Sequence, residues 1–459
     1  MLIRFNVKNF LSFAAKYNGD SEEFSMIAGK PRNKKEHIYD DGKIKVLKFA
    51  AVYGANAAGK SNLVKAMNFM RETIILGLPK GCTEKYCKIN PDNKDKESYF
   101  ELEILLGGKY YAYGFEVILN QGRFISEWLV ELGNDNSERI LFERDIENGT
   151  YELGSVLKKK NIYEKVKNYA EDVKNDNSAL FLSIMNQNKK NLYDENKEIK
   201  ILKNIFLWLV FDFSINFPNN PISNYSYMTD ESKLEEVLEI ISAFGTGINK
   251  FRIAEVQLGM VLNKLPKVLQ DKILSDIEER QIKLRVNDKE KNSIIIMRSE
   301  KDFFIIDINK DDVLCKTIEF SHEKKDVFFR LEEESDGTIR ILDLIEILLS
   351  GSGKTFVVDE LDRCLHPALT YKFISTFFKI AKEKNIQLIV TTHESRLLDF
   401  GLLRRDEIWF VNKKKNGESD IYSLEEYNAR FDLKIDRAYL EGRYGGVPIF
   451  NAIFPIEGE

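Results

Sequence analysis

The chain has 459 residues, 43% hydrophobic and 31% charged, a composition typical of a soluble globular protein with room for two or three domains. Its 68 Lys and Arg residues against 73 Asp and Glu residues give a net charge of −5, which argues against nucleic-acid binding by overall charge and leaves a local basic groove as an alternative. The longest apolar run, residues 205–211, is far shorter than the ~20 residues of a membrane span, so the sequence predicts no membrane partner.

The amino-terminal stretch MLIRFNVKNFLSF alternates apolar and polar residues, which predicts a β-strand and differs from the apolar core of a signal peptide. The chain has four cysteines, and Cys82 and Cys87 have no His or further Cys nearby to complete a zinc site. They are therefore predicted to be thiols, either buried or at the surface. These features together predict a reduced, cytoplasmic protein.

A phosphate-binding loop is predicted directly after the apolar strand at residues 46–53, VLKFAAVY. Gly54 and Gly59 stand at the spacing G-x-x-x-x-G-K-[ST], and apolar residues at helical spacing follow from Leu63 to Ile74. The N–H groups of such a loop and the N-terminus of the next helix converge on an anion. The predicted ATP-binding residues are Gly54, Ala55, Asn56, Ala57, Ala58, Gly59, Lys60, Ser61 and Asn62.

Composition divides the chain into three predicted parts. Residues 1–150 alternate strand patterns with one helix and contain a hairpin signal at Gly107-Gly108, so they are predicted to form an amino-terminal lobe. Residues 151–290 are charged and helical in pattern, which predicts a mainly helical insertion. Residues 291–459 return to strands and form the predicted carboxy-terminal lobe. The sequence shows no sustained heptad repeat, so a long coiled-coil arm is excluded.

The stretch ESDGT, residues 334–338, precedes a predicted helix that continues to Leu349. A Ser-x-Gly turn at a helix N-terminus is a potential anion site. The alternative is a plain N-cap with Ser335 as the capping residue.

The stretch GSGKT, residues 351–355, ends in the same Gly-Lys-hydroxyl triplet as the first loop. Leu348 occupies the position of the first glycine, and a β-branched strand follows Thr355 in place of a helix. We therefore interpret the stretch as a turn from a helix into a buried strand, without a phosphate-binding role for Lys354.

That strand, FVVDE, ends in two adjacent carboxylates. Asp359 at the end of a strand can hold Mg²⁺ opposite the hydroxyl of Ser61, so these two residues are the predicted metal ligands. Glu360 can polarise an attacking water as general base. The alternative is a strand that merely ends in a charged turn.

Residues 386–393, IQLIVTTH, are predicted to form another buried strand that ends at His393. Ligands of α/β sheets bind at the carboxyl ends of strands. His393 is therefore predicted to contact the γ-phosphate, with a structural role as the alternative.

In combination, these stretches resemble the ABC-type ATPases of the SMC, RecF and OLD group. The order is MLIRFNVKNFLSF, GANAAGKSN, an insertion, ESDGT, FVVDE, LDRCLHP and TTH. The resemblance is closest to the AAA-like ATPases of the abortive-infection and RloA type, and residues 402–411 and 437–450 are also similar to that subgroup. It implies an α/β fold, namely an ABC-type P-loop ATPase domain whose mixed sheet is antiparallel in its amino-terminal part and which carries a helical insertion.

The resemblance further implies ATP and Mg²⁺ as cofactors, slow hydrolysis of ATP to ADP and phosphate, and a homo-oligomer, at least a dimer that encloses two ATP molecules. His393 would be the switch residue, with Lys60 and Glu360 as its catalytic partners, and Asp362 of the D-loop would align the two sites. SDGT departs from the transporter signature, and Gln121 is a Q-loop candidate with a hairpin position as the alternative. The signature residues, which would act on the partner chain's ATP, are Ser335, Asp336, Gly337 and Thr338.

The same resemblance implies a sensor or scaffold in bacterial antiphage defence that controls a separate effector protein such as a nuclease. Residues 394–459 are too few for an added nuclease domain of ordinary size. The alternative is a DNA-binding repair clamp of the RecF kind, in which nucleic acid is the partner. Lysine clusters at 158–160, 189–190 and 413–415 are interpreted as solvated faces, with a nucleic-acid surface as the alternative.

Overall fold

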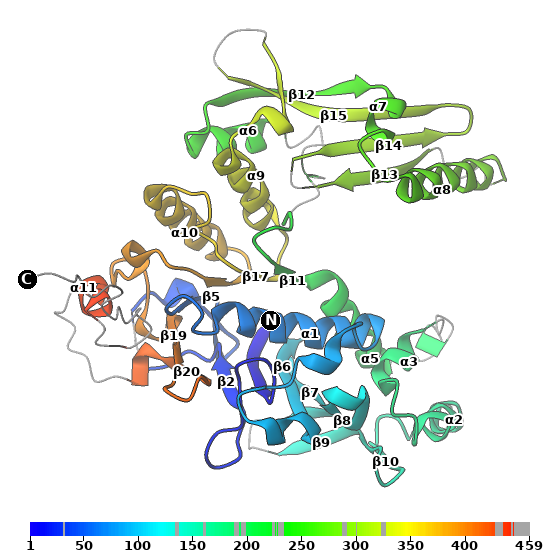
Figure 1. Ribbon diagram of the computed structural model, residues 1–459, viewed down its shortest axis with the longest axis vertical. Helices are drawn as coiled ribbons and strands as arrows, with labels where there is room; N and C mark the ends of the chain where they lie inside the picture. The colour runs from blue at the N-terminus through cyan, green and yellow to red at the C-terminus, as the bar shows by residue number, and fades with distance from the viewer. Residues whose placement is uncertain are drawn as a thin grey trace, which may run out of the picture. The chain divides into compact units, whose positions relative to one another are not determined.

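The structure, a computed structural model, consists of two compact units (Figure 1). Unit 1 comprises Met1–Ile215, Gly351–Leu361 and Ser375–Glu459, and unit 2 comprises Asn216–Ser350 and Asp362–Ile374. The predicted division at residues 150 and 290 stays a prediction. The residues described are 1–30, 33–133, 137–158, 162–187, 192–193, 199–222, 225, 227, 234–286, 292–299, 301–322, 327–426, 435–441 and 444.

Unit 1 contains an antiparallel seven-stranded sheet that includes the amino terminus. The predicted hairpin between β6 and β7 is confirmed, and both glycines of its turn, Gly107 and Gly108, have positive φ. Burial alternates along β6, as expected for a sheet with one covered face. The strand order is β10 (Thr150–Leu153), β9 (Glu138–Asp145), β8 (Arg123–Leu132), β7 (Lys109–Ile118), β6 (Ser98–Leu106), β1 (Leu2–Lys8) and β2 (Glu22–Ser25).

The second sheet of unit 1 has six strands, and β17, β18, β5 and β19 run parallel at its centre. All residues of β5, β17 and β18 are buried, which explains their nearly continuous apolar sequences. The order is β11 (Phe213–Asn216), β17 (Thr355–Val358), β18 (Gln387–Thr391), β5 (Phe49–Tyr53), β19 (Ile408–Lys413) and β20 (Ser419–Ser423).

The predicted strand at 46–53 is interrupted at Lys48. Residues before it form β4 (Lys45–Leu47), which pairs with β3 (Ile38–Asp40), whereas residues after it form β5. The two halves of the apolar run therefore belong to two different sheets. Lys48 is itself buried, and its ammonium donates to the carbonyl of Ala381.

Helix α1 (Lys60–Leu76) runs through unit 1 and buries an apolar face, as its spacing predicted (Figure 1). Phe69 of α1 packs against Phe10 and Phe100 of the antiparallel part, with ring centroids 5.0 Å away in both cases. The buried side chain of Gln387 on β18 accepts from the N–H of Leu2 at 2.8 Å and donates to its carbonyl at 2.9 Å. These contacts join the two large sheets of unit 1 into one core.

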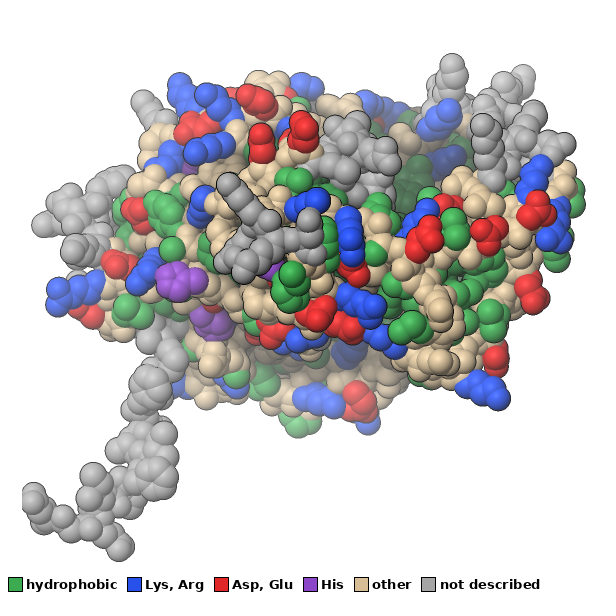
Figure 2. Space-filling model, turned by 90° about the horizontal axis from the view of Figure 1, so that it is seen from above, with side chains coloured by type: hydrophobic (Ala, Val, Ile, Leu, Met, Phe, Trp, Pro, Cys, Tyr) green, Lys and Arg blue, Asp and Glu red, His purple; other side chains and the backbone are tan. Residues whose placement is uncertain are grey.

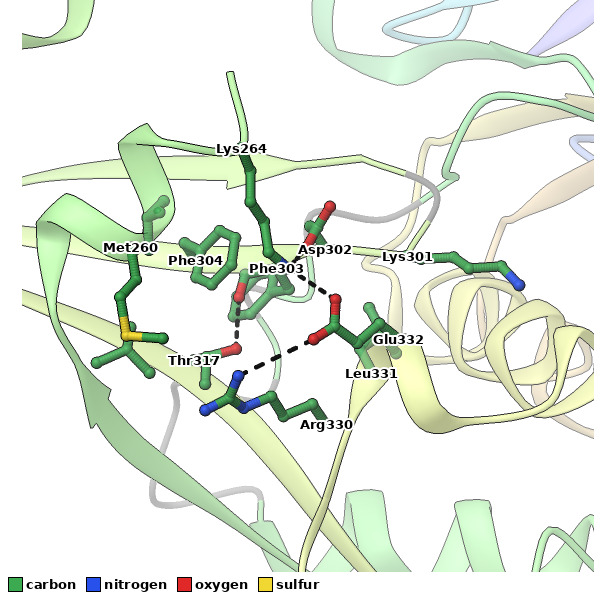
Figure 3. Close-up of a pocket in the computed structure, with 12 residues that line it drawn as sticks. Met260, Lys264, Lys301, Asp302, Phe303, Phe304, Thr317, Arg330, Leu331 and Glu332 are labelled. Atoms are coloured by element: carbon green, nitrogen blue, oxygen red, sulfur yellow. Dashed lines mark hydrogen bonds and ion pairs between the residues drawn. The ribbon is translucent and has the colours of Figure 1, made fainter. Parts of the chain in front are cut away.

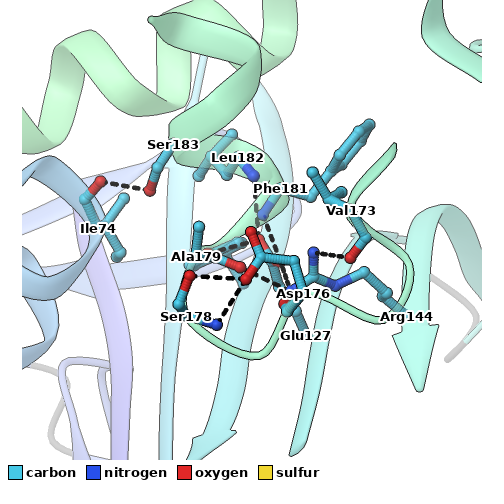
Figure 4. Close-up of polar contacts among 11 residues, drawn as sticks. Ile74, Glu127, Arg144, Val173, Asp176, Ser178, Ala179, Phe181, Leu182 and Ser183 are labelled. Carbon is cyan, nitrogen blue, oxygen red and sulfur yellow. Dashed lines mark hydrogen bonds and ion pairs between the residues drawn. The ribbon is translucent and has the colours of Figure 1, made fainter. Parts of the chain in front are cut away.

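A buried carboxylate anchors the short helix α3 (Phe181–Asn186) to the antiparallel sheet (Figure 4). Glu127 of β8 accepts the N–H groups of Phe181 at 2.6 Å and Leu182 at 3.0 Å and the hydroxyl of Tyr113 at 2.9 Å. Burial raises the pKa of Glu127, and the guanidinium of Arg144, 3.7 Å away, acts in the opposite direction. The other described α-helices of unit 1 are α2 (Tyr163–Val173), α5 (Lys200–Leu207), α11 (Ile435–Leu440) and the second half of α10 (Pro367–Ala381).

Unit 2 is built on an antiparallel sheet with the order β12-β15-β14-β13, and β16 pairs with β15. Helix α8 packs on it through Ile277 and Leu284, which lie in one buried cluster with Ile306 and Ile308 of β14. The elements are α6 (Leu234–Ala243), β12 (Ile248–Val256), α7 (Leu258–Leu262), α8 (Lys267–Val286), β13 (Asn292–Arg298), β14 (Phe303–Asn309), β15 (Val313–His322), β16 (Phe329–Arg330) and α9 (Asp336–Leu349).

The fold is therefore α/β with mixed sheets, as the sequence predicted. The helical pattern predicted within residues 151–290 is present in α2, α6 and α8, but the same stretch also contributes β11 and β12. Across the described ranges the structure shows no long coiled coil, since its longest helix, α8, has 20 residues. No helix in the described part of the chain is long and apolar enough to cross a membrane.

Candidate nucleotide-binding site

The loop 54–59 connects the carboxyl end of β5 to the N-terminus of α1, as the sequence predicted. Ala57 and Gly59 have positive φ values of 62° and 120°, and Asn56 and Ala57 are exposed. The loop thus folds back on itself with its tip open to solvent and delivers the chain to an α-helix N-terminus. Such a loop presents N–H groups and the positive end of a helix dipole to an anion.

Both loop glycines are required by close contacts. A Cβ atom at Gly54 would lie 2.4 Å from the carbonyl oxygen of Val411 on β19. At Gly59 a Cβ atom would lie 2.5 Å from Oγ of Ser419, in a backbone conformation that side chains rarely adopt. Any larger residue at either position would displace the loop from its neighbouring strands.

The side chains of Lys60 and Ser61, the two residues after the loop, both lie at the candidate site. The buried Nζ of Lys60 donates to the carbonyls of Gly54 at 2.8 Å and Ala55 at 3.3 Å, inside the curve of the loop. Oγ of Ser61 donates to Oδ1 of Asp359 at 3.2 Å across 298 residues of sequence. The structure therefore brings together the two predicted metal ligands.

A hydroxyl from the neighbouring strand organises the predicted acidic pair. Oγ1 of Thr391 donates to Oδ1 of Asp359 at 2.6 Å and accepts the N–H of Glu360 at 2.8 Å. The carbonyl of Thr391 accepts the N–H of Leu361 at 3.0 Å. Glu360 has φ 50°, a left-handed conformation that is uncommon for a residue with a side chain and frequent at functional sites.

The direction of the parallel strands shows that Lys60, and not Lys354, lies near this site. Asp359 and His393 follow the carboxyl ends of β17 and β18, the edge of the sheet at which β5 enters the loop. His393 is exposed there. Lys354 precedes β17 and therefore lies at the opposite edge of the sheet. The interpretation of residues 351–355 as a turn into a buried strand is confirmed.

The predicted signature residues and Asp362 belong to unit 2. Ser335 caps α9 by accepting the N–H of Thr338 at 3.1 Å, so the N-cap expected as an alternative is present. Ser335 and Asp336 are exposed. Glu334, the buried residue before the cap, lies 2.7 Å from Nε2 of His322. The N-terminus of α9 is thus open to solvent, with its preceding residue tied to β15.

Sequence reasoning missed the hydroxyls that support the loop. Ser12 accepts a hydrogen bond from the amide of Asn62 at 2.8 Å and another from Oγ of Ser419 at 2.8 Å. Through this bond the amide of Asn62 connects α1 to the segment after β1, and its role in ATP binding stays a prediction. For Thr391, the sequence does offer a signal, because its hydroxyl stands at the end of an apolar strand. For Ser12 and Ser419 it offers none, because only the folded chain brings these two residues together.

The remaining residues that the sequence analysis singled out have no place in the candidate site or lie outside the described residues. Gln121 ends a short turn between β7 and β8 and accepts from Nε of Arg123, which agrees with the hairpin alternative. Cys82 and Cys87 are buried free thiols. Residues 159–160 and 189–190 of the lysine clusters, and residues 442–443 and 445–450 of the stretch 437–450, lie outside the described ranges. On the face drawn in Figure 2, Lys and Arg side chains are interspersed with Asp and Glu side chains.

Unit 2 has a separate pocket beside β14 and β15 (Figure 3). Its apolar wall includes Phe303 and Phe304. At its rim, Nζ of Lys264 lies 2.8 Å from Oδ1 of Asp302 and 2.6 Å from Oε2 of Glu332. The lining contains none of the predicted site residues. Lys264 pairs within the pocket, whereas Lys301 of the lining pairs with Asp336 of the predicted signature at 2.9 Å.

Residues 49–399 match the family described as "AAA domain, putative AbiEii toxin, Type IV TA system". The match covers well over half of the chain and spans the loop, the acidic pair and the strand that ends near His393. The chain belongs to this AAA family. It therefore has an ATPase-type domain, in which the loop 54–62 and Asp359 occupy one edge of the parallel sheet. The comparison with curated proteins found no match.

Solved structures similar to this AAA family member include three SMC heads. They are an SmcHead bound to the C-winged helix domain of ScpA (14% identity, 92% of this chain, 97% of that chain, TM-score 0.41), the SMC head domain from Thermotoga maritima (12%, 92%, 98%, 0.34), and an Smc head with an extended coiled coil bound to the C-terminal domain of ScpA from Pyrococcus furiosus (16%, 96%, 98%, 0.33).

The residues at the site of this AAA domain fit Mg²⁺. The ion prefers oxygen ligands, and proteins often hold it through one or two carboxylates together with substrate phosphates. Asp359 and Ser61 offer such oxygens 3.2 Å apart beside a phosphate-binding loop.

Proposed function

We propose that the chain binds ATP with Mg²⁺ at the loop 54–62 and hydrolyses it to ADP and phosphate. The observation that carries this proposal is the hydrogen-bonded group formed by Ser61, Asp359 and the N–H of Glu360 around Thr391, at the sheet edge where the loop opens. Lys60 and the loop N–H groups would hold the phosphates. Mg²⁺ held by Ser61 and Asp359 would neutralise charge on the phosphate oxygens.

Glu360 is the proposed general base. It stands one residue after the metal ligand, is only partly buried, and is held in a left-handed conformation by its own N–H bond. A carboxylate there can take a proton from the water that attacks the γ-phosphate. His393, exposed at the same edge, is proposed to contact the γ-phosphate as the switch residue.

Nucleotide binding by matched lysine variants tests the assignment of the loop. Lys60→Ala is expected to abolish binding of a fluorescent ATP analogue, because the buried ammonium inside the loop is lost. Lys354→Ala is expected to bind normally, because Lys354 precedes β17 at the opposite sheet edge. Loss of binding by the Lys354 variant with retention by the Lys60 variant would reverse the assignment of the two loops.

We further propose that the ATP-bound chain forms a dimer and acts as a sensor or scaffold in antiphage defence, with a separate effector such as a nuclease. Membership of a family described by a putative AbiEii toxin supports this role. The exposed N-terminus of α9, with Ser335 and Asp336, is the surface through which one chain would contact the ATP of another.

The partner is identified by recovering the tagged Glu360→Gln chain from its native host, with Lys60→Ala as a control that lacks bound ATP. A stoichiometric protein recovered with Glu360→Gln alone would support the sensor and name the effector. Abundant DNA without a protein partner would replace this role by the DNA-clamp alternative.

A further inference from the structure

Thr391 makes three hydrogen bonds to three consecutive residues of the acidic turn. Its hydroxyl contacts Asp359 and the N–H of Glu360, and its carbonyl contacts the N–H of Leu361. The side chain is 1% exposed, so water does not replace these partners. A carboxylate accepts and an N–H donates, hence the hydroxyl proton points to Asp359 and a lone pair of Oγ1 points to Glu360.

We propose that Thr391 is the positioning residue for both the metal ligand and the general base, an inference that rests on the proposed ATPase function. Its role toward Asp359 is to fix the rotation of the carboxylate. Oδ1 receives the hydroxyl of Thr391 at 2.6 Å and that of Ser61 at 3.2 Å. The direction in which Asp359 would offer oxygen to Mg²⁺ therefore depends on Thr391, which is not one of the two predicted metal ligands.

Its role toward Glu360 is to hold the backbone. A left-handed conformation is unfavourable for a residue with a side chain, and Glu360 keeps it at φ 50°. The N–H groups of Glu360 and Leu361 both donate to Thr391, the first to its hydroxyl and the second to its carbonyl. These two bonds fix the peptide groups before and after the strained residue. Without the hydroxyl, one of these bonds is lost and Glu360 is free to relax and turn its carboxylate away.

The test compares two variants at position 391 with a matched threonine. Thr391→Val keeps the shape and removes the hydroxyl, whereas Thr391→Ser keeps the hydroxyl. Thr355→Val is the control, because Thr355 is also fully buried in this sheet and donates to a side chain, Gln387, but at the amino end of β17. Two quantities are measured: kcat for ATP, and the affinity for a fluorescent ATP analogue with Mg²⁺ and with EDTA.

We expect Thr391→Val to lose about 10–100-fold in kcat, the usual effect of removing a hydrogen-bond partner of a metal ligand. Its affinity for nucleotide in EDTA should stay unchanged while the gain on adding Mg²⁺ shrinks. Thr391→Ser should restore both quantities toward wild type, and Thr355→Val should alter neither.

Normal kcat and a normal Mg²⁺ effect in Thr391→Val would overturn the proposal. Equal losses in Thr355→Val, or no recovery in Thr391→Ser, would assign the effect to packing and overturn it as well. If the wild-type chain binds ATP and never hydrolyses it, the ATPase proposal fails on its own. The Mg²⁺ effect on affinity still decides whether Thr391 positions Asp359.

Discussion

Glu360 is the residue whose substitution separates binding from hydrolysis. Glu360→Gln keeps the size of the side chain and the N–H bond to Thr391, so ATP should bind as before. Removal of a general base lowers kcat by about 10²–10⁴-fold. Steady-state hydrolysis and nucleotide affinity check this expectation, with Glu383→Gln on an exposed position as the control. Wild-type turnover in Glu360→Gln would remove this carboxylate from the base role.

The buried His37–Glu407 pair gives the stability of unit 1 a pH dependence. Nδ1 of His37 lies 2.8 Å from Oε1 of Glu407, and its ring stacks on Phe378 at 3.5 Å. Burial lowers the pKa of His37 from 6.5 to about 4. Between these two pH values His37 is protonated in the unfolded state and neutral in the folded state. The free energy of unfolding therefore has its full value above pH 6.5 and decreases as the pH falls toward 4.

Thermal or urea unfolding at pH 7 and pH 5 measures this effect. The difference in free energy of unfolding between the two pH values should be about 2 kcal/mol smaller in His37→Gln than in the wild type. Burial raises the pKa of Glu407, whose contribution has the opposite sign and is present in both proteins. His366→Gln, at an exposed position, should keep the wild-type pH dependence. The same slope in His37→Gln would assign the acid sensitivity to other groups.

At the scale of elements, the stability of helix α3 depends on contacts with strand β8 rather than on the helix propensity of its own sequence. Six residues are too few for an independently stable helix, and the first N–H groups of α3 end on the carboxylate of Glu127. Glu127→Ala would leave these N–H groups without their buried acceptor. The guanidinium of Arg144 would keep its bonds to backbone carbonyls but would lose its buried counter-charge. Breaking a buried ion pair in this way costs about 3–5 kcal/mol.

Urea unfolding of matched variants on the same strand checks the role of Glu127. Glu131 of β8 is also ion-paired, with Lys109 at 2.8 Å, but at the exposed end of the strand. Glu131→Ala should cost at most about 1 kcal/mol. Similar losses for the two variants would show that α3 is held by packing, without a special contribution from Glu127.

The elements that could be predicted from the sequence are those whose pattern is local. The loop at 54–62, α1, β17 and β18 follow from apolar runs and glycine spacing, because buried parallel strands and helix spacing leave a period in the sequence. The interruption at Lys48 could not be predicted in this way. It arises because β4 and β5 pair with strands of different sheets.

At the scale of the whole molecule, the unpredicted features depend on distant parts of the chain. Thr391 meets Asp359 across 32 residues, and Ser419 meets Ser12 across 407 residues. A single hydroxyl has no periodicity, so only the folded chain shows which hydroxyls reach the site. The division into two units also follows from packing, since unit 1 collects three separate stretches of the chain.

Whether the signature acts on another molecule can be decided by mixing two inactive chains. Lys60→Ala lacks the loop lysine but keeps α9 intact. Ser335→Asp has the opposite defect: aspartate remains a good N-cap for the N–H of Thr338, so α9 keeps its cap, but its charge repels a γ-phosphate. Each chain alone should hydrolyse ATP poorly.

In a mixed dimer, the intact loop of the Ser335→Asp chain would face the intact signature of the Lys60→Ala chain. We therefore expect equal amounts of the two variants to recover part of the wild-type turnover, because one complete site forms in each mixed dimer. A third variant, Lys60→Ala combined with Ser335→Asp, should restore nothing when mixed with either chain. If mixing gives only the sum of the separate activities, Ser335 acts on the ATP of its own chain or not at all, and the proposed dimer loses its chemical basis.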